Sequence, residues 1–454
     1  MAVSSGGRMQ RIPSTVNVVN ICHVHCLISS AQSLENKLGA LQCHFTWNLD
    51  PGSCRLTVIQ SIVEDIGTEE GNVWLGHIYN LQGFIQYKLG SSEEALIFFS
   101  QATETFKRLK NSDEGPWLMV NFGNLAWLHH LMGKDEKTQD YLSKIEALMR
   151  KYPAPTKEEL HPEVCAEKAW TLMRFDKEKA AELFQRAIEM QPENVEWQSS
   201  WAILSTHTFK LYMKDRTPNV LEKVRSATEG DPDNLYVAAL YLEARAAKGE
   251  QIQNEAQALA ERVLKRSPSS YNGMRPLLRL YRNYISKDAE LELAEEALRR
   301  HPDSRYLKRI VSSCLTKRIL SPDYNPPVRE INRAIKLQRE VIDSYGESNP
   351  RDQLNLAKLL AKAGKPEANK IYKELLDRKD LDLAEKQMLY NSYAKYSFFN
   401  KKDSRGSLKY HMMAAEIPIE SKYRETSVTE LKKTLDRIKD REICERIKKL
   451  LTGL

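Results

Sequence analysis

Small and apolar residues recur along the chain at helical spacing. Ala180, Phe184 and Ala187 lie four and then three residues apart, which places them on one face of a helix. Pro192 follows five residues after the last of them. Because proline lacks a backbone donor and fixes φ, a helix has to end near that position. The pattern predicts a helix that packs through small residues and stops before Pro192.

The same frame returns downstream. A small or branched residue precedes a proline by five residues three more times, at Ala227 and Pro232, Val263 and Pro268, and Ala297 and Pro302. The four prolines are 40, 36 and 34 residues apart. These separations converge on the tetratricopeptide unit, which has two antiparallel helices in 34 residues, small residues at helix crossings and a closing proline.

Weaker copies of the unit flank these four. They are carried by Gly83, Gly90, Ala95, Phe99 and Ala102, by Ala126 and Gly133, by Ala357, Gly364 and Ala368, and by a degenerate last pair at 386–412. About eight helix pairs stacked in this way form a superhelix with a concave inner face. The sequence therefore predicts an all-α tetratricopeptide-repeat solenoid with a basic concave groove.

Two stretches with three prolines each, at 152–162 and 321–328, interrupt the frame. Helices have to end there, so we expect subdomain joints. Residues 1–34 differ in composition from the rest and are predicted to be a disordered leader. The remaining predicted subdomains are 35–152, 153–320 (which carries the basic groove) and 321–454.

Composition narrows the class of protein. With 19 glycines, 18 prolines and 28% charged residues, the chain favours long, solvated helices. No run of 18 apolar residues predicts a membrane span. We find no phosphate-binding loop, no metalloprotease or nucleophile-elbow motif and no dinucleotide glycine pattern. The sequence predicts a binding scaffold that is not an enzyme and needs no cofactor.

Seven cysteines are scattered along the chain, which is no disulfide framework and indicates a reducing compartment. Cys22, His23, His25 and Cys26 could in principle contact zinc. Adjacent ligands in one short run seldom close a tetrahedron, and no second pair stands at finger-like spacing. We therefore predict no metal site.

The net charge of +7 is uneven, because residues 1–160 carry 14 basic and 17 acidic side chains and the rest carry 54 and 44. Such a surplus is compatible with an anionic partner such as RNA, or with an ordinary charged surface. Arg275, Arg279 and Arg282 lie four and three residues apart, on one helix face. Leu277 and Leu280 belong to the opposite, packed face, together with Tyr281 and Tyr284.

A second basic group, Arg305, Lys308 and Arg309, follows one repeat later. Stacked helices would set the two groups side by side, as a trough whose guanidinium forks fit phosphate oxygens. The alternative is that these side chains face bulk water. Aromatic residues nearby could stack RNA bases or pack the core: Trp170, Trp197, Trp201, Tyr236, Tyr241 and Tyr271. For Trp201 and Tyr241 we expect core packing.

Several motifs resemble the interferon-induced proteins with tetratricopeptide repeats. The run Cys-His-Phe-Thr-Trp-Asn-Leu at 43–49 is close to a signature of that family's first helix. Further matches are Tyr-Asn-Leu at 79–81, Gly-Asn-Leu-Ala-Trp at 123–127, the segment 162–175, the segment 184–192 and Asp-Pro-Asp-Asn-Leu-Tyr at 231–236. The resemblance covers about residues 35–440.

The resemblance implies a cytoplasmic, interferon-induced antiviral effector. Several members bind the 5′ end of foreign single-stranded RNA, as triphosphate or as cap lacking 2′-O-methylation, in a basic tunnel, and block translation. Other members act mainly through protein partners, which for this chain would be translation factors or related family members, with oligomers allowed. No membrane partner is expected.

Individual positions carry over from the family. Trp170 falls at the cap-stacking tryptophan, Arg174 at a phosphate-contacting lysine and Tyr236 at a tunnel tyrosine. Arg275 and Arg282 fall at tunnel arginines, so the resemblance and the helical spacing indicate the same residues.

Some positions depart from the family. His207 replaces a phosphate-binding arginine, and Asn272 and Pro276 replace tyrosines. The predicted RNA-binding set is Trp170, Arg174, His207, Tyr236, Arg275, Arg279, Arg282, Lys308 and Arg309. The competing prediction is a protein-interaction adaptor with little RNA binding, for which stacked repeats serve equally well.

Overall fold

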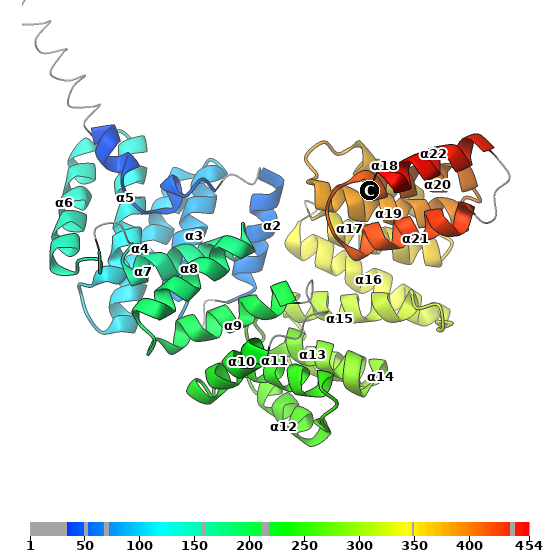
Figure 1. The fold of residues 1–454 in the computed structure, drawn as a ribbon, viewed down its shortest axis with the longest axis horizontal. Coiled ribbons are helices and arrows are strands. Elements are labelled where there is room, and N and C mark those ends of the chain that lie inside the picture. Colours follow the sequence, from blue (N-terminus) through cyan, green and yellow to red (C-terminus); the bar gives the residue numbers. More distant parts are fainter. Residues whose placement is uncertain are drawn as a thin grey trace, which may run out of the picture. The chain divides into compact units, whose positions relative to one another are not determined.

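The protein is built from helices (Figure 1). The computed structural model describes residues 34–49, 53–67, 72–156, 160–209, 218–346, 349–435 and 441–453, and no strand occurs within these ranges. Successive antiparallel helix pairs pack on one another through most of this length. The prediction of an all-α tetratricopeptide-repeat solenoid is confirmed.

Contacts between residues group the chain into two compact units. Unit 1 comprises residues 1–49 and 76–168, and unit 2 comprises residues 50–75 and 169–454. An early segment of the chain therefore packs with the later repeats. The division into three subdomains at the proline-rich stretches stays a prediction.

The described helices of unit 1 form consecutive pairs, joined by short turns. They are the 3₁₀ helix η1 (His44–Thr46), α3 (Leu75–Lys88), α4 (Ser92–Lys110), the 3₁₀ helix η2 (Pro116–Leu118), α5 (Met119–Leu131), α6 (Asp135–Lys151) and the first part of α7 (Pro162–Leu172).

Unit 2 holds α2 (Ser53–Glu64) and the helices that follow α7. These are α8 (Lys177–Met190), α9 (Val195–Phe209), α10 (Pro218–Gly230), α11 (Leu235–Ala247), α12 (Gln253–Leu264), α13 (Met274–Leu280), the π-helix η3 (Tyr281–Ile285), α14 (Lys287–Arg300), α15 (Arg305–Ile319), α16 (Val328–Tyr345), α17 (Pro350–Lys362), α18 (Glu367–Asp377), α19 (Leu383–Phe399), α20 (Ser404–Glu416), α21 (Lys422–Leu435) and α22 (Arg441–Thr452).

The alanine and proline frame corresponds to the second helix of each pair. Its small residues are buried in α8, α10, α12 and α14, at Ala187, Ala227, Val263 and Ala297. Each of these helices ends two or four residues before the proline of the frame. The frame therefore predicted both the packed face and the end of these helices correctly.

Glycine lets the first pair approach closely. A Cβ atom added to Gly83 of α3 would lie 2.7 Å from the Phe99 ring of α4, closer than side-chain packing allows. Gly90 ends the first helix of this pair with φ of +99°, a conformation that favours glycine. Both positions had been assigned to a weaker repeat, and the structure confirms their role.

The proline-rich stretches break helices as expected. Helix α6 ends at Lys151 and α7 begins at Pro162, while α15 ends at Ile319 and α16 begins at Val328. The degenerate pair expected at 386–412 is present as α19 and α20.

Other sequence predictions lie at or beyond the edge of the described chain. Residues 1–33 of the predicted leader (1–34), with the Cys22–Cys26 segment, fall outside the described residues. Among the described helices, none combines the length and apolarity needed to cross a bilayer. In the same ranges, no three metal-ligating side chains come together. Cys43 and Cys314 are buried thiols without a disulfide partner, and Cys165 is buried as well.

Candidate nucleic-acid interface

A cavity of about 770 Å³ lies within unit 2. Its walls are formed by α2, α13, η3, α14, α15, α16, α17, α19 and α21. Seven cationic side chains line it, namely Arg55, Arg275, Arg279, Arg282, Arg309, Lys317 and Arg351. Four carboxylates line it as well, namely Glu290, Asp352, Asp382 and Glu385. Cations therefore outnumber carboxylates, and the ion pairs among them decide which charges are available to a ligand.

Arg275 is an exposed side chain on this cavity wall. Gly273 caps α13 with φ of +92°, and a Cβ there would lie 2.7 Å from the Leu235 carbonyl oxygen of α11. This close approach fixes where α13 begins and therefore where Arg275 lies. The guanidinium lies 5.4 Å from the Tyr306 ring centre. Within the described ranges, no carboxylate oxygen comes within 4.0 Å of it.

Arg279 lies one turn further along α13 and is committed to a carboxylate. Its Nε donates to Glu243 Oε1 at 2.5 Å and Oε2 at 2.7 Å, and its Nη2 also contacts Oε2. The two side chains are 15% and 13% exposed. This fork-to-carboxylate pair joins α13 to α11 and neutralises the Arg279 charge.

Arg282 lies in the π-helix η3 and pairs with a buried carboxylate. Its Nη1 donates to Glu290 Oε1 at 2.7 Å. Lys317 Nζ lies 3.8 Å from the same oxygen, and the Cys314 thiol donates to it at 3.5 Å. Burial, reinforced by the Glu290 charge, raises the pKa of Cys314 to about 12, so its thiol stays protonated.

The second predicted basic group is divided between two environments. Arg309 lines the cavity, forms an ion pair with Asp352 at 2.9 Å between Nη2 and Oδ2, and stacks on the Tyr345 ring at 4.5 Å. Lys308 lies outside the cavity lining and contacts Glu340 at 3.1 Å. Of the second basic group, Arg309 therefore lines the same cavity as the first group.

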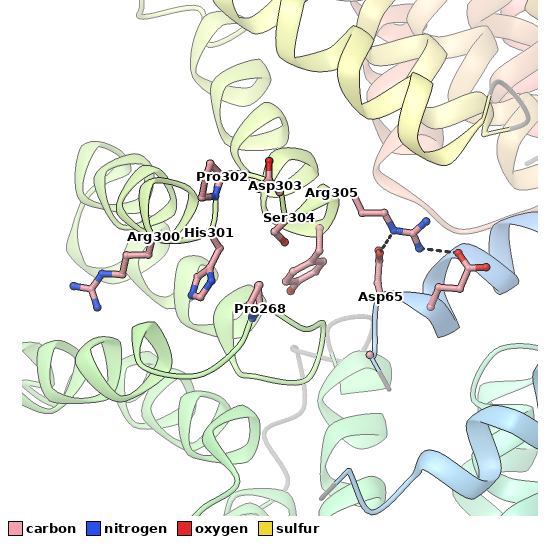
Figure 2. Close-up of a pocket in the computed structure, with 11 residues that line it drawn as sticks. Asp65, Pro268, Arg300, His301, Pro302, Asp303, Ser304 and Arg305 are labelled. Atoms are coloured by element: carbon pink, nitrogen blue, oxygen red, sulfur yellow. Dashed lines mark hydrogen bonds and ion pairs between the residues drawn. The ribbon is translucent and has the colours of Figure 1, made fainter. Parts of the chain in front are cut away.

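A second cavity, of about 520 Å³, surrounds the start of α15 (Figure 2). Arg305 points toward the carboxylates on its wall and lies 2.8 Å from Glu64 and 3.4 Å from Asp65. The Tyr345 hydroxyl donates to Asp65 at 2.6 Å. Two arginines, Arg300 and Arg305, and three carboxylates, Glu64, Asp65 and Asp303, line this cavity, so it offers no surplus of arginine charge to a polyanion.

Arg174 and Tyr236, two of the residues predicted to hold the RNA end, lie together with Tyr271 in unit 2. The Arg174 guanidinium donates to the Tyr271 hydroxyl at 3.1 Å, and the Tyr271 and Tyr236 rings are 5.5 Å apart. Burial raises the pKa of Tyr236 to about 12. Trp170 is only 2% exposed, so stacking of a base on its ring requires the ring to be uncovered. None of these four is among the side chains that line the large cavity.

Two further predictions have different outcomes. His207 belongs to α9, but its side chain falls outside what the structure describes. Trp201 and Tyr241 were expected in the core and are only partly buried. The expectation of core packing was wrong because cationic side chains lie over these rings, Lys223 at 4.3 Å from the Trp201 ring centre and Arg245 at 5.8 Å from the Tyr241 ring centre. Amphipathic side chains close these rings without a core around them.

Sequence reasoning missed three cations of the large cavity. Arg351 is exposed at the start of α17, and no carboxylate oxygen of the described residues comes within 4.0 Å of it. Arg55 comes from α2, 3.7 Å from Asp382, and Lys317 comes from α15. A search for cations at the start of each repeat would have found Arg351. Helix α2 lies outside the repeat frame, so no sequence signal indicated Arg55.

The cavity carboxylates have identifiable roles. Asp382 caps α19 by accepting from the Glu385 backbone at 2.8 Å, and Glu385 accepts from the Asp382 backbone at 3.0 Å. Glu290 and Asp352 neutralise Arg282 and Arg309. Arg275 and Arg351 are therefore the two lining cations with no carboxylate oxygen within 4.0 Å in the described chain, and Asp65 and Asp352 act on them electrostatically from further away.

Comparison with known proteins places this arrangement in context. No model of a known protein family matches the chain. The antiviral innate immune response effector IFIT1 of Homo sapiens is 26% identical over 418 residues, or 88% of this chain and 87% of that protein. Interferon-induced protein with tetratricopeptide repeats 2 of Mus musculus is 26% identical over 439 residues, or 92% of this chain and 88% of that protein.

Solved structures agree with the sequence comparison. The human IFIT1 dimer with m7Gppp-AAAA has a TM-score of 0.72 at 25% identity and covers 92% of this chain and 95% of that chain. The human IFIT1 dimer with PPP-AAAA has a TM-score of 0.70 at 25% identity, with 93% and 96% covered. Sequence and fold therefore agree over nearly the whole length that the chain resembles the interferon-induced proteins with tetratricopeptide repeats.

Proposed function

We propose that this protein is a cytoplasmic antiviral scaffold that binds single-stranded RNA in the large cavity of unit 2. The observation that carries the proposal is the pair Arg275 and Arg351, which are exposed on the cavity wall with no carboxylate oxygen within 4.0 Å among the described residues. An arginine whose charge is not neutralised fits a phosphate oxygen pair. The solved relatives with capped or triphosphate oligonucleotides support the same ligand class.

The finer form of the proposal concerns RNA ends. The protein binds foreign 5′ ends, as triphosphate or as cap lacking 2′-O-methylation, and thereby blocks translation of viral RNA. Arg174, beside Tyr271 and Tyr236, contacts the terminal phosphates, and Trp170 stacks on the terminal base or cap after its ring is uncovered. Arg279, Arg282, Lys308 and Arg309 stay predicted contacts that would have to leave a carboxylate, and His207 stays a predicted contact as well.

We propose that the protein binds its ligand without catalysis. The cavity carboxylates are used in ion pairs and in the α19 cap, so we propose no general base among them. No cofactor enters the proposal.

The ion pairs also favour a second candidate function. Glu243, Glu290 and Asp352 neutralise three of the predicted RNA-binding arginines, which is what a structural role for those arginines requires. Under this alternative the protein is an adaptor that assembles with translation factors or with related family members. The dimers of the solved relative are compatible with such assembly.

Filter binding at two salt concentrations separates the two functions, because phosphate binding weakens steeply with salt. We expect a 5′-triphosphate oligonucleotide to bind with a clear salt slope, and Arg275→Glu to lower both affinity and slope. Trp170→Ala should lower affinity and leave the slope intact, since stacking contributes roughly 1–3 kcal/mol per base without counterion release. Equal and salt-insensitive binding of wild type and Arg275→Glu would leave the adaptor as the function.

A further inference from the structure

One face of α17 leads from the large cavity toward later helices. Arg351, Asn355, Lys358 and Lys362 lie four, three and four residues apart on this helix, which places them on one face. Arg351 and Asn355 line the cavity. Lys358 is partly buried and Lys362 is exposed. The helix face that reaches the cavity therefore continues through Lys358.

Two more lysines come to this place from neighbouring helices. Helix α17 packs against α19, and α19 packs against α21, with Asn391 Nδ2 of α19 donating to the Tyr423 carbonyl of α21 at 3.1 Å. Lys395 of α19 and Lys422 of α21 are exposed. Both act electrostatically on Lys358, as Arg351 does.

These charges form no close ion pair with the part of the chain that the structure describes. Within the described ranges, no carboxylate oxygen lies within 4.0 Å of Lys358, Lys395, Lys422 or Arg351. Glu430 acts on Lys395, but it is held by Lys433 at 2.9 Å. Burial and the three neighbouring cations lower the pKa of Lys358 to about 8. The folded protein therefore keeps an electrostatically unfavourable group that a bound polyanion would stabilise.

We propose that Lys358, Lys395 and Lys422 form a second phosphate-binding subsite, which holds the backbone of the bound RNA beyond the stretch seated in the large cavity. The inference rests on the proposed function, because the same strand passes Arg351 from one site to the other. Lysine ammonium groups act as point charges on flexible stems and carry no base-reading fork. Binding at this subsite therefore depends on the length of the RNA strand and not on its base sequence.

The test compares two RNAs that share a 5′ triphosphate and differ in length, with four and with twelve adenosines. The variant Lys358→Gln/Lys395→Gln/Lys422→Gln removes the subsite. The control Lys88→Gln/Lys134→Gln/Lys137→Gln removes the same net charge from exposed positions in unit 1. Circular dichroism confirms that both variants are folded.

For wild type and control we expect the longer RNA to bind more tightly and with a steeper salt slope. In the subsite variant the slope for the longer RNA should fall by about two, from roughly 0.7 for each of three phosphate contacts. Its affinity for the shorter RNA should stay within about twofold of wild type.

Other outcomes overturn the inference in distinguishable ways. If Arg275→Glu weakens both RNAs and the subsite variant weakens neither, the strand does not reach the lysines and the proposed function stands. If the subsite variant weakens both RNAs equally, the lysines are not beyond the cavity. If wild type binds neither RNA, the inference falls together with the proposed function.

Discussion

Arg275 and Arg279 lie one turn apart on the same cavity wall, yet they should respond differently to charge removal. Arg275 has no carboxylate within 4.0 Å in the described chain, whereas Arg279 is forked onto Glu243. Helical spacing in the sequence gives no reason to distinguish the two arginines. The structure predicts that Arg275 binds RNA and that Arg279 holds α13 on α11.

The two perturbations are Arg275→Gln and the charge-neutral pair Arg279→Gln/Glu243→Gln. A hydrogen bond to a charged group contributes roughly 1.5–3 kcal/mol, which is roughly a 10- to 150-fold loss of RNA affinity for Arg275→Gln. The salt slope should fall by about 0.7. The pair variant leaves the net charge unchanged, so its affinity should stay within about threefold of wild type.

Stability should show the reverse order. The single variant Arg279→Gln leaves Glu243, which is 13% exposed, without its partner. An unsatisfied, largely buried charged group costs about 1–3 kcal/mol of unfolding free energy, and restoring neutrality with Glu243→Gln should recover most of it. Arg275→Gln removes no ion pair and should change the unfolding free energy by less than about 0.5 kcal/mol.

Filter binding with a 5′-triphosphate oligonucleotide at two salt concentrations and urea unfolding measure these quantities. The reasoning is refuted if the pair variant loses as much affinity as Arg275→Gln. In that case Arg279 leaves Glu243 to contact RNA, and the ion pairs of the RNA-free protein do not identify the residues that contact the ligand.

Three further predictions follow from burial and packing. Burial lowers the pKa of His44 in unit 1 and of His411 in unit 2 to about 4, below the unfolded value near ~6.5. The unfolded chain therefore binds more protons than the folded chain in this pH range. The free energy of unfolding should fall as the pH is lowered from about 6.5 to about 4, by up to about 3 kcal/mol for each histidine. A free energy of urea unfolding that does not change with pH would contradict this. Gly83→Ala should destabilise the first pair by about 1–3 kcal/mol, because its Cβ would meet the Phe99 ring at 2.7 Å, whereas Gly39→Ala, with nothing within 4 Å, should be nearly neutral in thermal unfolding. Because the pKa of Lys358 is about 8, binding of the longer RNA should weaken from pH 7 to pH 9 in wild type and not in Lys358→Gln.

The repeat frame was predictable because its physical causes are local. Ala187 and Pro192 act within one helix, through close packing and a missing donor, and both effects are visible in the sequence spacing. The arginine positions were predictable for the same reason, and Arg275, Arg279 and Arg282 do share the cavity.

Pairing was not predictable, because it depends on residues brought together by folding. Glu243 is 36 residues from Arg279 in sequence, and Asp352 reaches Arg309 from another repeat. The π-helix η3 adds a second effect, since a wider turn changes where Arg282 points relative to an ideal α-helix. Helical spacing of arginines in the sequence therefore identifies residues that line a site, but it overestimates the positive charge that is available to a ligand there.

The number of available charges limits how the protein can discriminate RNAs. If Arg275 and Arg351 are the phosphate contacts of the cavity, its salt slope is about 1.4, and the three lysines of the proposed subsite add about two. Both terms are independent of base sequence and of the 5′ end. Discrimination between 5′ ends must then come from the residues proposed to hold that end. Arg174 offers one cation beside the phenol rings of Tyr271 and Tyr236, with the buried Trp170 as a further ring to uncover. Changing a 5′ triphosphate to a hydroxyl should therefore lower affinity and reduce the salt slope by about 0.7, from the single contact to Arg174, whereas shortening the RNA should reduce the slope by about two.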